Sequence, residues 1–482
     1  MSYRFFCVHG HFYQPPREDA LTSEIPVEPG ATPYENWNER INAHCYRPNA
    51  ALNNFRRISF DLGPTLAAWL EDFDITTYRR ILEQNQYNYE RYGVGNAMAQ
   101  AYNHTILPLS TRLDKITQIA WGKADFEFRF GHSPKGMWLP ETAVDIETLE
   151  ILAENGIEFT ILAPWQANAR TLDVSHPYRV RLKDGKSICV FFYHQELSTR
   201  ISFDPASTSN ADQFVLKAVL PSYNARWQMA DKPQLLLVAS DGEVYGHHQP
   251  FRDKFLAYLM DGGVMGQAIE VTYPALWLKN YPVEEWMEIV PNTSWSCHHG
   301  VMRWQGACGC TPHSEWKSPL RKGLNLVAQL VDEQYMNFMT PFFSDPWQIR
   351  HQYIHVLCKR ATLRDLIEGL AARKPSLEEK RKMQILLAAQ YERQRMFTSC
   401  GWFFDDFDRI EPRNNVAYAA QAVWLTELAC GVDVSPRVMN ILKKVVSPRT
   451  GLRADVVFKR ALNRARRFQG SPVGQLFLGD LD

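Results

Sequence analysis

Two acidic residues stand directly after apolar segments, in positions that suit the cleavage of a glycosidic bond. Glu141 follows Trp138-Leu139-Pro140, and Asp241 follows the apolar stretch 235–239 and Ser240. Because Pro140 cannot continue a β-ladder, a strand ends there and presents Glu141 at its carboxyl end. Glycosidic bond cleavage needs one carboxylic acid to protonate the leaving oxygen and one carboxylate to attack the anomeric carbon or activate water. The alternative is that Glu141 is only a charge favoured at the start of a helix.

Histidines follow the same kind of segment. His9-Gly10-His11 comes after the first apolar stretch, and Glu243 and His247-His248 come after Asp241. A His-x-His pair could bind a metal, hydrogen-bond a substrate or be buried, and the residues alone leave these open. A strand-ending turn would use Asp-Gly as well, but it needs neither Glu243 nor the paired histidines. His104, which precedes an apolar turn, is by itself more typical of a structural residue.

The first 280 or so residues alternate short apolar strands with helical segments. The candidate strands are Arg4–Val8, Arg57–Leu62, Gly136–Leu139, Phe159–Leu162, Ile188–Tyr193, Gln234–Ser240 and Ile269–Thr272. A helical pattern over Ala143–Asn155 ends at Gly156, as a helix stop should. This alternation predicts a parallel sheet with helices outside it. Chemistry in such folds lies on the loops at the carboxyl ends of the strands, where the polar clusters fall.

The character of the chain changes after Asn280. Residues Asn292–Ser318 indicate a long structured loop, and helical spacing follows over Leu320–Met339, Ile349–Leu370, Leu377–Phe397 and Val416–Cys430. We therefore expect a catalytic barrel over residues 1–285 and a helical domain over 286–482 that completes the substrate cleft. Aromatic rings stack on sugar faces and carboxylates bind hydroxyls. The candidates from this half are Trp295, His299, Trp402, Asp405 and Asp406.

A cysteine cluster lies in the same loop. Cys297, Cys308 and Cys310, with His298, His299 and His313 nearby, could form a zinc site. Their Cys-x-Cys spacing is not the usual Cys-x-x-Cys, which favours a structural loop with buried thiols and no metal.

Composition excludes several classes of partner. Lys plus Arg and Asp plus Glu both number 53, and this balance argues against binding to nucleic acid or a membrane surface. No run approaches the roughly 18 apolar residues of a membrane span, and the N-terminal residues do not resemble a signal peptide. The 9 cysteines are scattered and odd in number, unlike a disulfide framework. We expect a cytoplasmic protein whose partner is an oligo- or polysaccharide, and the oligomeric state stays open.

Four segments, in order along the chain, resemble signature motifs of glycoside hydrolase family 57. They are His11-Phe12-Tyr13-Gln14-Pro15, Tyr102–Leu109, Trp138-Leu139-Pro140-Glu141 and Asp241–Gly246. The chain is also similar to the branch of this family that carries a C-terminal domain of unknown function (type 3536), marked by Asn38–Asn42 and Ser399–Asp406. It departs from the family at Tyr13, where the first signature usually has its second histidine. The fifth signature has two candidate places, at Trp295 and at Trp402–Asp406.

The resemblance implies an α/β fold: an incomplete (β/α)7 barrel followed by an α-helical C-terminal domain. It implies retention of anomeric configuration, α-glucans as substrates and no metal or other cofactor, with Glu141 as nucleophile and Asp241 as general acid/base. The two carboxyl groups are then expected to lie roughly 5 to 6 Å apart. The remaining substrate-binding candidates are His11, Gln14, His104, Trp138, Glu243 and His247, of which Glu243 is expected to orient a histidine or the loop.

Three alternatives to an α-amylase-like hydrolase remain. A 4-α-glucanotransferase or a branching enzyme would use the same glycosyl-enzyme intermediate. A metal-dependent polysaccharide deacetylase or mannosidase could use His9, His11, His247 and His248 as ligands, but no Asp-Asp pair or His-x-x-x-His spacing accompanies them. A non-catalytic glucan-binding protein would be expected to lose one of the carboxylates, and both are present.

Overall fold

A computed structural model of the chain describes residues 3–229 and 232–468, which form two compact units. Unit 1 comprises Met1–Gln14, Val27–Ala101 and Phe126–Ser296, and unit 2 comprises Pro15–Pro26, Tyr102–Asp125 and Cys297–Asp482. This division differs from the expected one at residues 285 and 286. Residues beyond 285 still pair with unit 1, through the bridges Ala167–Ile289 and Val144–Thr293. Two earlier segments belong instead to unit 2, the loop 15–26 and the stretch 102–125, which includes most of α6 (Arg112–Phe130).

The main sheet of unit 1 consists of parallel strands in the order β4-β3-β2-β1-β8. They are β1 (Arg4–Phe12), β2 (Ser59–Leu62), β3 (Ala97–Gln100), β4 (Met137–Trp138) and β8 (Gln234–Asp241). The short strand β9 (Glu270–Val271) also pairs with β1. β3 was not among the expected strands, because its four residues, Ala-Met-Ala-Gln, lack the β-branched and aromatic side chains that mark strands.

A second sheet joins β5 (Phe159–Leu162) to β7 (Ser187–Phe192) in parallel, with β6 (Tyr178–Arg181) antiparallel on the edge of β7. A parallel bridge between Gly136 and Phe159 connects it to β4, and the N–H of His194 donates to the Leu237 carbonyl of β8 at 2.7 Å. The strands β8-β1-β2-β3-β4-β5-β7 therefore run round an incomplete barrel. The predicted fold class, this barrel followed by helices, is confirmed.

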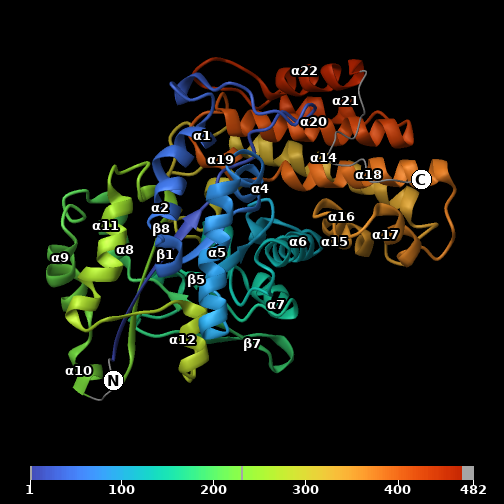
Figure 1. The fold of residues 1–482 in the computed structure, drawn as a ribbon. Coiled ribbons are helices and arrows are strands. Elements are labelled where there is room, and N and C mark those ends of the chain that lie inside the picture. The colour runs from blue at the N-terminus through green and yellow to red at the C-terminus, as the bar shows by residue number, and fades with distance from the viewer. Residues whose placement is uncertain (1–2, 230–231, 469–482) are drawn as a thin grey trace. The chain divides into compact units, whose positions relative to one another are not determined.

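Burial explains why the barrel strands are so apolar. β1 is buried over its whole length after Arg4, and β8 is buried up to Ser240, as strands covered on both faces must be. Helices that include α5 (Ile75–Tyr92), α7 (Ile146–Glu154) and α8 (Gln195–Phe203) lie around these strands (Figure 1). The core between the strands includes Phe5, Cys7, Trp138, Ile161, Leu235 and Leu237.

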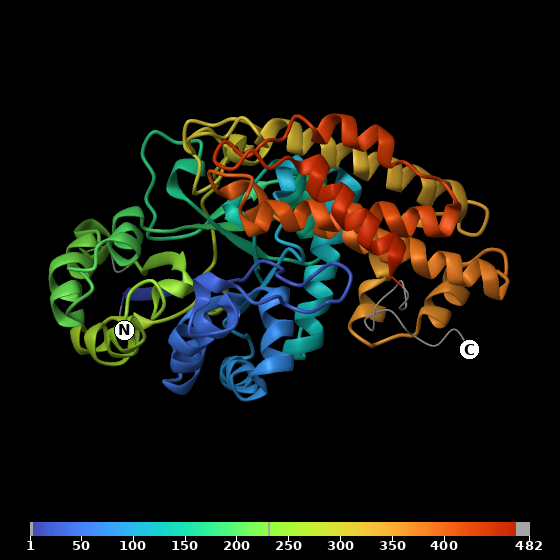
Figure 2. The same ribbon diagram turned by 90° about the horizontal axis from the view of Figure 1, so that it is seen from above.

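Unit 2 is mainly helical after residue 297. Its long helices α14 (Lys317–Met339), α18 (Leu377–Arg395), α20 (Ile410–Cys430) and α22 (Ala454–Arg467) lie along one another (Figure 2). The single helix expected over Ile349–Leu370 is wrong, because the chain forms α15 (Pro346–Gln352), α16 (Ile354–Leu357) and α17 (Leu363–Leu370). Lys359 adopts a left-handed backbone with φ 56°, and the Thr362 hydroxyl accepts from the Asp365 N–H and starts the last helix.

None of the described helices combines the length and the apolar character that crossing a membrane requires.

Candidate active site at the strand ends of unit 1

Strand register places three of the chemical side chains of unit 1 in one row. His11 on β1 is the register partner of Asp61 on β2 and of Asp241 on β8. In parallel strands, residues in register at the carboxyl ends share one edge of the sheet. On the next strand pair, Trp138 of β4 lies in register with Gln100 of β3, immediately before the Pro140-Glu141 turn. The strands therefore bring together side chains that are up to 230 positions apart in the sequence.

Glu141 lies in a tight turn and not in a helix. The turn Pro140–Thr142 precedes α7, which begins only at Ile146 and is capped by the Asp145 carboxylate. The expected helix start at Ala143 is therefore wrong, and so is the idea that Glu141 is a helix-start charge. Its backbone is left-handed, with φ 58°, a conformation that non-glycine residues adopt rarely and mostly where surrounding contacts enforce it.

Two donors converge on one oxygen of Glu141. Trp295 Nε1 donates to Oε2 at 3.1 Å and the Ser296 hydroxyl donates to the same atom at 2.6 Å. The Trp295 N–H also donates to the Glu141 carbonyl at 3.0 Å. Burial raises the pKa of Glu141, as does the charge of Asp241, whereas the Ser296 and Trp295 hydrogen bonds and the charge of His11 lower it.

Asp241 differs from Glu141 in its hydrogen bonding. It lies at the end of β8 with part of its surface open to solvent, and desolvation of its carboxyl group raises its pKa. The charges of His11 and His248 oppose that rise. Among the described residues, none donates a hydrogen bond to the Asp241 carboxyl group. No hydrogen bond from the described residues therefore stabilises the ionised form of Asp241 over the neutral form.

Asp61 holds the two histidines of β1. Its Oδ1 lies 3.1 Å from His9 Nε2, and its Oδ2 lies 2.8 Å from His11 Nδ1. His9 Nδ1 is also 2.9 Å from the Ser59 hydroxyl, so both of its ring nitrogens have protein partners. Burial alone would lower the pKa of His11, but the charge and hydrogen bond of Asp61, with the charges of Asp241 and Glu243, raise it to about 9. His11 is therefore a cation at neutral pH.

Glu243 anchors the loop that follows β1. Its Oε1 accepts from the Tyr46 hydroxyl at 2.6 Å and from the Tyr13 N–H at 3.3 Å. Gln14 Nε2 in turn donates to the Tyr46 oxygen at 2.9 Å. The pKa of Glu243 is raised to about 7, mainly by burial and also by the charge of Asp241. The hydrogen bond from Tyr46 lowers it in part. Tyr13, which departs from the family signature, thus meets Glu243 through its backbone.

The aromatic residues of this site have different exposures. Trp138 is fully buried and stacks on His9 and His11, with ring centroids 4.8 Å and 5.1 Å apart. It therefore orients the histidines and has no free face for a sugar. Trp295 is only partly buried and meets Trp138 edge to face at 5.1 Å. Of these two rings, Trp295 is the one that can contact a ligand.

His247 lies in unit 1 but among other aromatic rings. Its ring is half-buried against Trp37 and His44, at centroid distances of 6.1 Å and 6.0 Å. Burial, with the charges of His248 and His44, lowers the pKa of His247 to about 4. The residue is therefore neutral at physiological pH.

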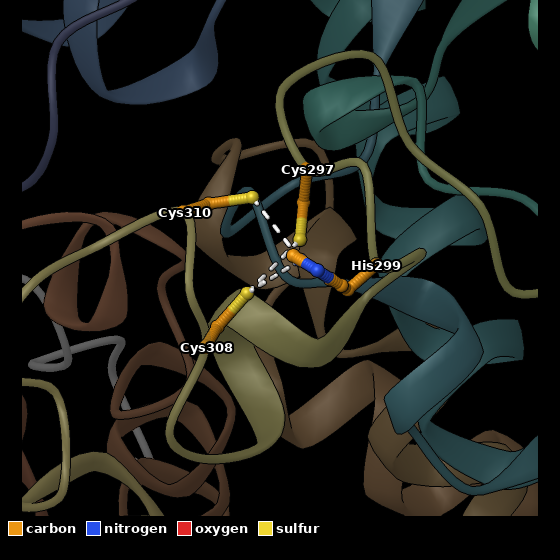
Figure 3. A group of neighbouring side chains, drawn as sticks. All are labelled: Cys297, His299, Cys308 and Cys310. Carbon is orange, nitrogen blue, oxygen red and sulfur yellow. Dashed lines mark hydrogen bonds between the residues drawn. The ribbon is translucent and has the colours of Figure 1, made fainter.

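The other candidates belong to unit 2. His104 is buried with a left-handed backbone, and its Nδ1 is 2.7 Å from the Ser399 hydroxyl. Trp402, favoured as a ring on the cleft wall, is fully buried, with the Arg321 guanidinium 3.8 Å from its centroid. It presents no face for stacking in this structure. His299 Nδ1 lies 3.3 Å from the sulfurs of both Cys308 and Cys310 (Figure 3).

The two aspartates of unit 2 also have protein partners. Asp405 is half-exposed and pairs with Arg409 at 3.0 Å. Asp406 is buried and accepts from the Ser447 hydroxyl at 2.7 Å. These contacts suit roles in holding the helices of unit 2.

Three residues of the site were not singled out from the sequence: Asp61, Tyr46 and Ser296. Only Asp61 carries a signal, as an acid within the short strand Ser59–Leu62. Tyr46 and Ser296 lie in a helical segment and a loop where nothing marks them as chemical residues.

A separate cavity of about 590 Å³ lies within unit 2. Asp114 and Asp332 in its wall both pair with Arg393, each at 2.7 Å. Asp114 also pairs with Arg350 at 3.2 Å, so the two carboxylates are matched by two guanidinium groups, and we assign no chemistry to this cavity.

Comparison with known proteins groups the chain with carbohydrate-active enzymes. Residues 49–287 match the model of glycosyl hydrolase family 57, and residues 313–466 match the domain of unknown function DUF3536. Alpha-amylase 1 of Dictyoglomus thermophilum is 26% identical over 149 residues, which cover 29% of this chain and 19% of that protein. The match thus spans about a fifth of that relative's length.

Solved structures share the fold at low sequence identity. An exo-type maltose-forming amylase from Pyrococcus sp. ST04 superimposes with a TM-score of 0.75 at 15% identity, covering 95% of this chain and 88% of that chain. A family 57 branching enzyme from Pyrococcus horikoshii gives a TM-score of 0.62 at 14% identity, covering 99% of both chains. At these identities the likeness concerns the fold alone.

Proposed function

Since this chain belongs to glycosyl hydrolase family 57, we propose that it is a retaining enzyme that acts on α-glucans, with Glu141 as nucleophile and Asp241 as general acid/base. Names of similar proteins, among them an α-amylase and a maltose-forming amylase, support an α-glucan as the substrate. Within this class we favour α-amylase-like hydrolysis, with transfer to a second sugar as the alternative fate of the same intermediate.

The observation that carries the proposal is the unequal hydrogen bonding of the two carboxyl groups. Donors from Trp295 and Ser296 stabilise a negative charge on Glu141, whereas no described donor does so for Asp241. When two nearby carboxyl groups share one proton, the proton resides on the group whose ionised form is less stabilised. The arrangement therefore favours a neutral Asp241, ready to donate, beside an ionised Glu141, ready to attack.

The reaction then follows in two displacements. Glu141 Oε1, which the two donors leave free, forms a bond to the anomeric carbon while Asp241 transfers its proton to the departing glycosidic oxygen. In the second step the Asp241 carboxylate removes a proton from water, and the resulting attack breaks the bond to Glu141. Acceptance of a sugar hydroxyl in place of water gives transglycosylation.

The remaining residues have supporting roles in this proposal. Cationic His11 lies in register with Asp241 and is suited to donate to a sugar hydroxyl, and Trp295 is suited to contact a sugar ring. The protein pairing of both His9 nitrogens with Ser59 and Asp61 argues against a deacetylase-type metal site there. A cytoplasmic location belongs to the proposal as well, because the 9 free cysteines suit a reducing compartment.

The test is product analysis combined with nucleophile rescue. Maltooligosaccharides and amylose are incubated with the protein, and NMR follows the anomeric configuration of the first products. Retained α products are expected, and inverted products would contradict the double displacement. Glu141→Gly with azide should give a β-glycosyl azide, and Asp241→Gly with azide and an activated substrate should give the α-anomer.

One variant tests the size of the catalytic contribution of Asp241, and a second serves as a control. Asp241→Asn should lower kcat by about 10²–10⁴-fold on amylose, since proton transfer contributes that much, and by far less on substrates with an acidic leaving group. Glu158→Gln, on the exposed Glu158 that pairs with Lys135, should leave turnover unchanged. Wild-type protein that binds maltooligosaccharides without any turnover would support the non-catalytic alternative instead.

A further inference from the structure

Four potential metal ligands gather in the loop at the start of the last segment of unit 2. The sulfurs of Cys297, Cys308 and Cys310 and a ring nitrogen of His299 all lie within 4.8 Å of one another. Figure 3 shows the four side chains pointing toward a common centre from separate stretches of the loop. Within the described residues, no other group of three or more histidines, cysteines and acids forms such a cluster.

The distances match those of a four-coordinate zinc ion. Zn–S bonds of ~2.3 Å and Zn–N bonds of ~2.05 Å in a tetrahedron place two sulfurs about 3.8 Å apart and a sulfur about 3.6 Å from a nitrogen. Here Cys297 Sγ and Cys308 Sγ are 3.6 Å apart, and His299 Nδ1 lies 3.3 Å from Cys308 Sγ and from Cys310 Sγ. These separations are also much longer than a disulfide bond of ~2.05 Å.

Backbone N–H groups around the cluster donate hydrogen bonds to two of the sulfurs. Cys297 accepts hydrogen bonds from the N–H groups of His299 and Arg303, and Cys310 accepts one from that of His298. Hydrogen bonds of this kind stabilise and orient metal-bound ligands. The loop itself is fixed by a bridge between Cys308 and Thr311 and by the Cys308 N–H, which donates to the Ser314 hydroxyl at 3.0 Å.

Lys317 supplies a compensating charge. Three thiolates, a neutral imidazole and Zn²⁺ carry one net negative charge. The Lys317 side chain is buried, and its Nζ has no hydrogen-bond partner among the described residues. Burial and the charge of Arg303 lower the pKa of Lys317 to about 8, whereas the charges of Cys308 and Cys297 oppose that fall. Burial of an ammonium that has no hydrogen-bond partner in the described part of the chain and only the Trp316 ring, 5.7 Å from Nζ, as an aromatic neighbour is costly, and a centre with net negative charge offsets that cost.

We propose that Cys297, His299, Cys308 and Cys310 bind one structural Zn²⁺ ion. Four protein ligands complete the tetrahedron and leave no open position, which distinguishes a structural zinc site from a catalytic one. Cys297 and Cys308 are buried, whereas His299 is exposed and Cys310 partly so, which gives the metal a route of entry. The proposal goes beyond the enzymatic function and does not depend on it, because binding can be measured without turnover.

The site also has a consequence for the neighbouring residues in the chain. Cys297 directly follows Ser296, one of the two donors to Glu141. A metal bound at Cys297 therefore restrains the backbone next to both donors and acts as a positioning element. Gradual removal of zinc should lower kcat in parallel with metal content, and an unchanged kcat in folded zinc-free protein would overturn this positioning role without bearing on zinc binding itself.

The primary experiment measures metal in the full-length protein, purified under reducing conditions without a chelator from cells supplied with zinc. One zinc per chain is expected, and a metal-free or iron-containing folded protein would overturn the proposal. Replacement by Co²⁺ should give the strong visible bands of a tetrahedral thiolate complex. Mass spectrometry that finds a disulfide between Cys297 and Cys308 in this protein would also contradict it.

Variants identify the ligands. Cys308→Ser and His299→Ala should lose stoichiometric zinc and the Co²⁺ spectrum, whereas His298→Ala and Cys430→Ser, at a histidine and a cysteine outside the cluster, should keep both. Retention of one zinc per chain by Cys308→Ser would exclude this site. If the ligand variants fail to fold, titration of wild-type protein with a thiol reagent gives the answer, because zinc should be released as the cluster thiols react.

Discussion

The two donors on Glu141 Oε2 define how this carboxylate works. Trp295 and Ser296 both donate to the same oxygen, and the proposed function uses the other oxygen for attack. Hydrogen bonds to a charged group are worth about 1.5–3 kcal/mol each, and here they oppose the larger effect of desolvation, which raises the pKa of Glu141. The ionisation of Glu141 is thus expected to depend on these two residues.

Replacement of Ser296 by alanine should therefore change the pH dependence of the enzyme. Loss of the 2.6 Å hydrogen bond raises the pKa of Glu141 further, so the nucleophile becomes protonated at a higher pH. The acidic limb of kcat/KM should move upward by about one to two pH units, since 1.36 kcal/mol corresponds to one pKa unit. Ser296→Thr, which keeps a hydroxyl, should restore most of the original profile. An unshifted acidic limb in Ser296→Ala would show that Ser296 does not control the ionisation of Glu141.

Asp61 should likewise control the charge of His11. The neighbouring carboxylates raise the pKa of His11 to about 9, so in the wild-type protein the imidazolium stabilises the fold fully below its unfolded value of ~6.5. That contribution is lost as the pH rises through about 9. In Asp61→Asn, burial dominates and the pKa of His11 should fall below 6.5. NMR titration of the histidine ring resonances measures both values, and a His11 that still titrates near 9 in the variant would contradict the assignment.

The sequence singled out residues where a strand ends in an acid, and it gave no signal for the partners that come from loops. Glu141 and Asp241 are recognisable because Pro140 and the apolar run before Asp241 each predict the end of a strand. Ser296 and Tyr46 cannot be recognised from the sequence, because their importance comes only from the carboxylates that they contact in the folded chain. For the cysteine cluster, the Cys-x-Cys spacing favoured a loop with buried thiols, and only the folded loop shows that Cys297, His299, Cys308 and Cys310 bring their ligand atoms within 4.8 Å of one another.

At the scale of elements, the site depends on how closely the loop after β8 packs. Gly246 has φ 131°, and a Cβ built there would lie 2.2 Å from the backbone oxygen of His44. His44 belongs to the same segment as Tyr46, which holds Glu243. The turn after Asp241 therefore requires glycine both for its backbone angle and for its contact with this segment.

Gly246→Ala should destabilise unit 1 and reduce activity together. A strained φ costs on the order of 1–3 kcal/mol, and the clash with His44 adds to it because backbone cannot move aside cheaply. Urea unfolding should report a lower free energy of unfolding, and kcat/KM should fall as Glu243 and Asp241 are displaced. Gly266→Ala is the matched control, because a Cβ added there would have nothing within 4 Å and its φ lies outside the left-handed region. Equal stability of the two variants would show that the loop has more freedom than we infer.

Strand prediction at this scale followed side-chain type. β1, β5, β7 and β8 carry apolar or aromatic residues over at least four positions and were placed within a few residues of their observed ends. β3 was missed because Ala97–Gln100 has the composition of a helix, and only its pairing with β2 and β4 makes it a strand.

At the scale of the whole molecule, each unit is assembled from three separate stretches of chain. The expected boundary at residue 285 came from a change in composition along the chain. Composition cannot show that residues 15–26 and 102–125, which lie within the barrel part of the sequence, pack in unit 2. Trp121 illustrates the interdependence, since it is fully buried and its Nε1 donates to the Arg350 carbonyl at 3.0 Å.

Truncation should therefore fail where a two-module protein would tolerate it. A chain ending at residue 296 keeps all of unit 1 but exposes the apolar side chains of 102–125 that unit 2 buries, such as Trp121. It should aggregate or bind a hydrophobic dye strongly, and co-expression of residues 297–482 should suppress both effects. A soluble 1–296 fragment without dye binding would show that the first two segments of unit 2 are dispensable.

Because each unit is built from separate stretches of chain, some contacts of unit 2 cannot form until long after their first partner has been synthesised. The Arg350 carbonyl that accepts from Trp121 is made 229 residues after it. At roughly 5–20 residues per second, this corresponds to a delay of about 10 to 45 s in which the nascent chain carries uncovered aromatic surface. Shielding by a chaperone, or slow production at low temperature, would then decide how much of the newly made chain reaches the folded state.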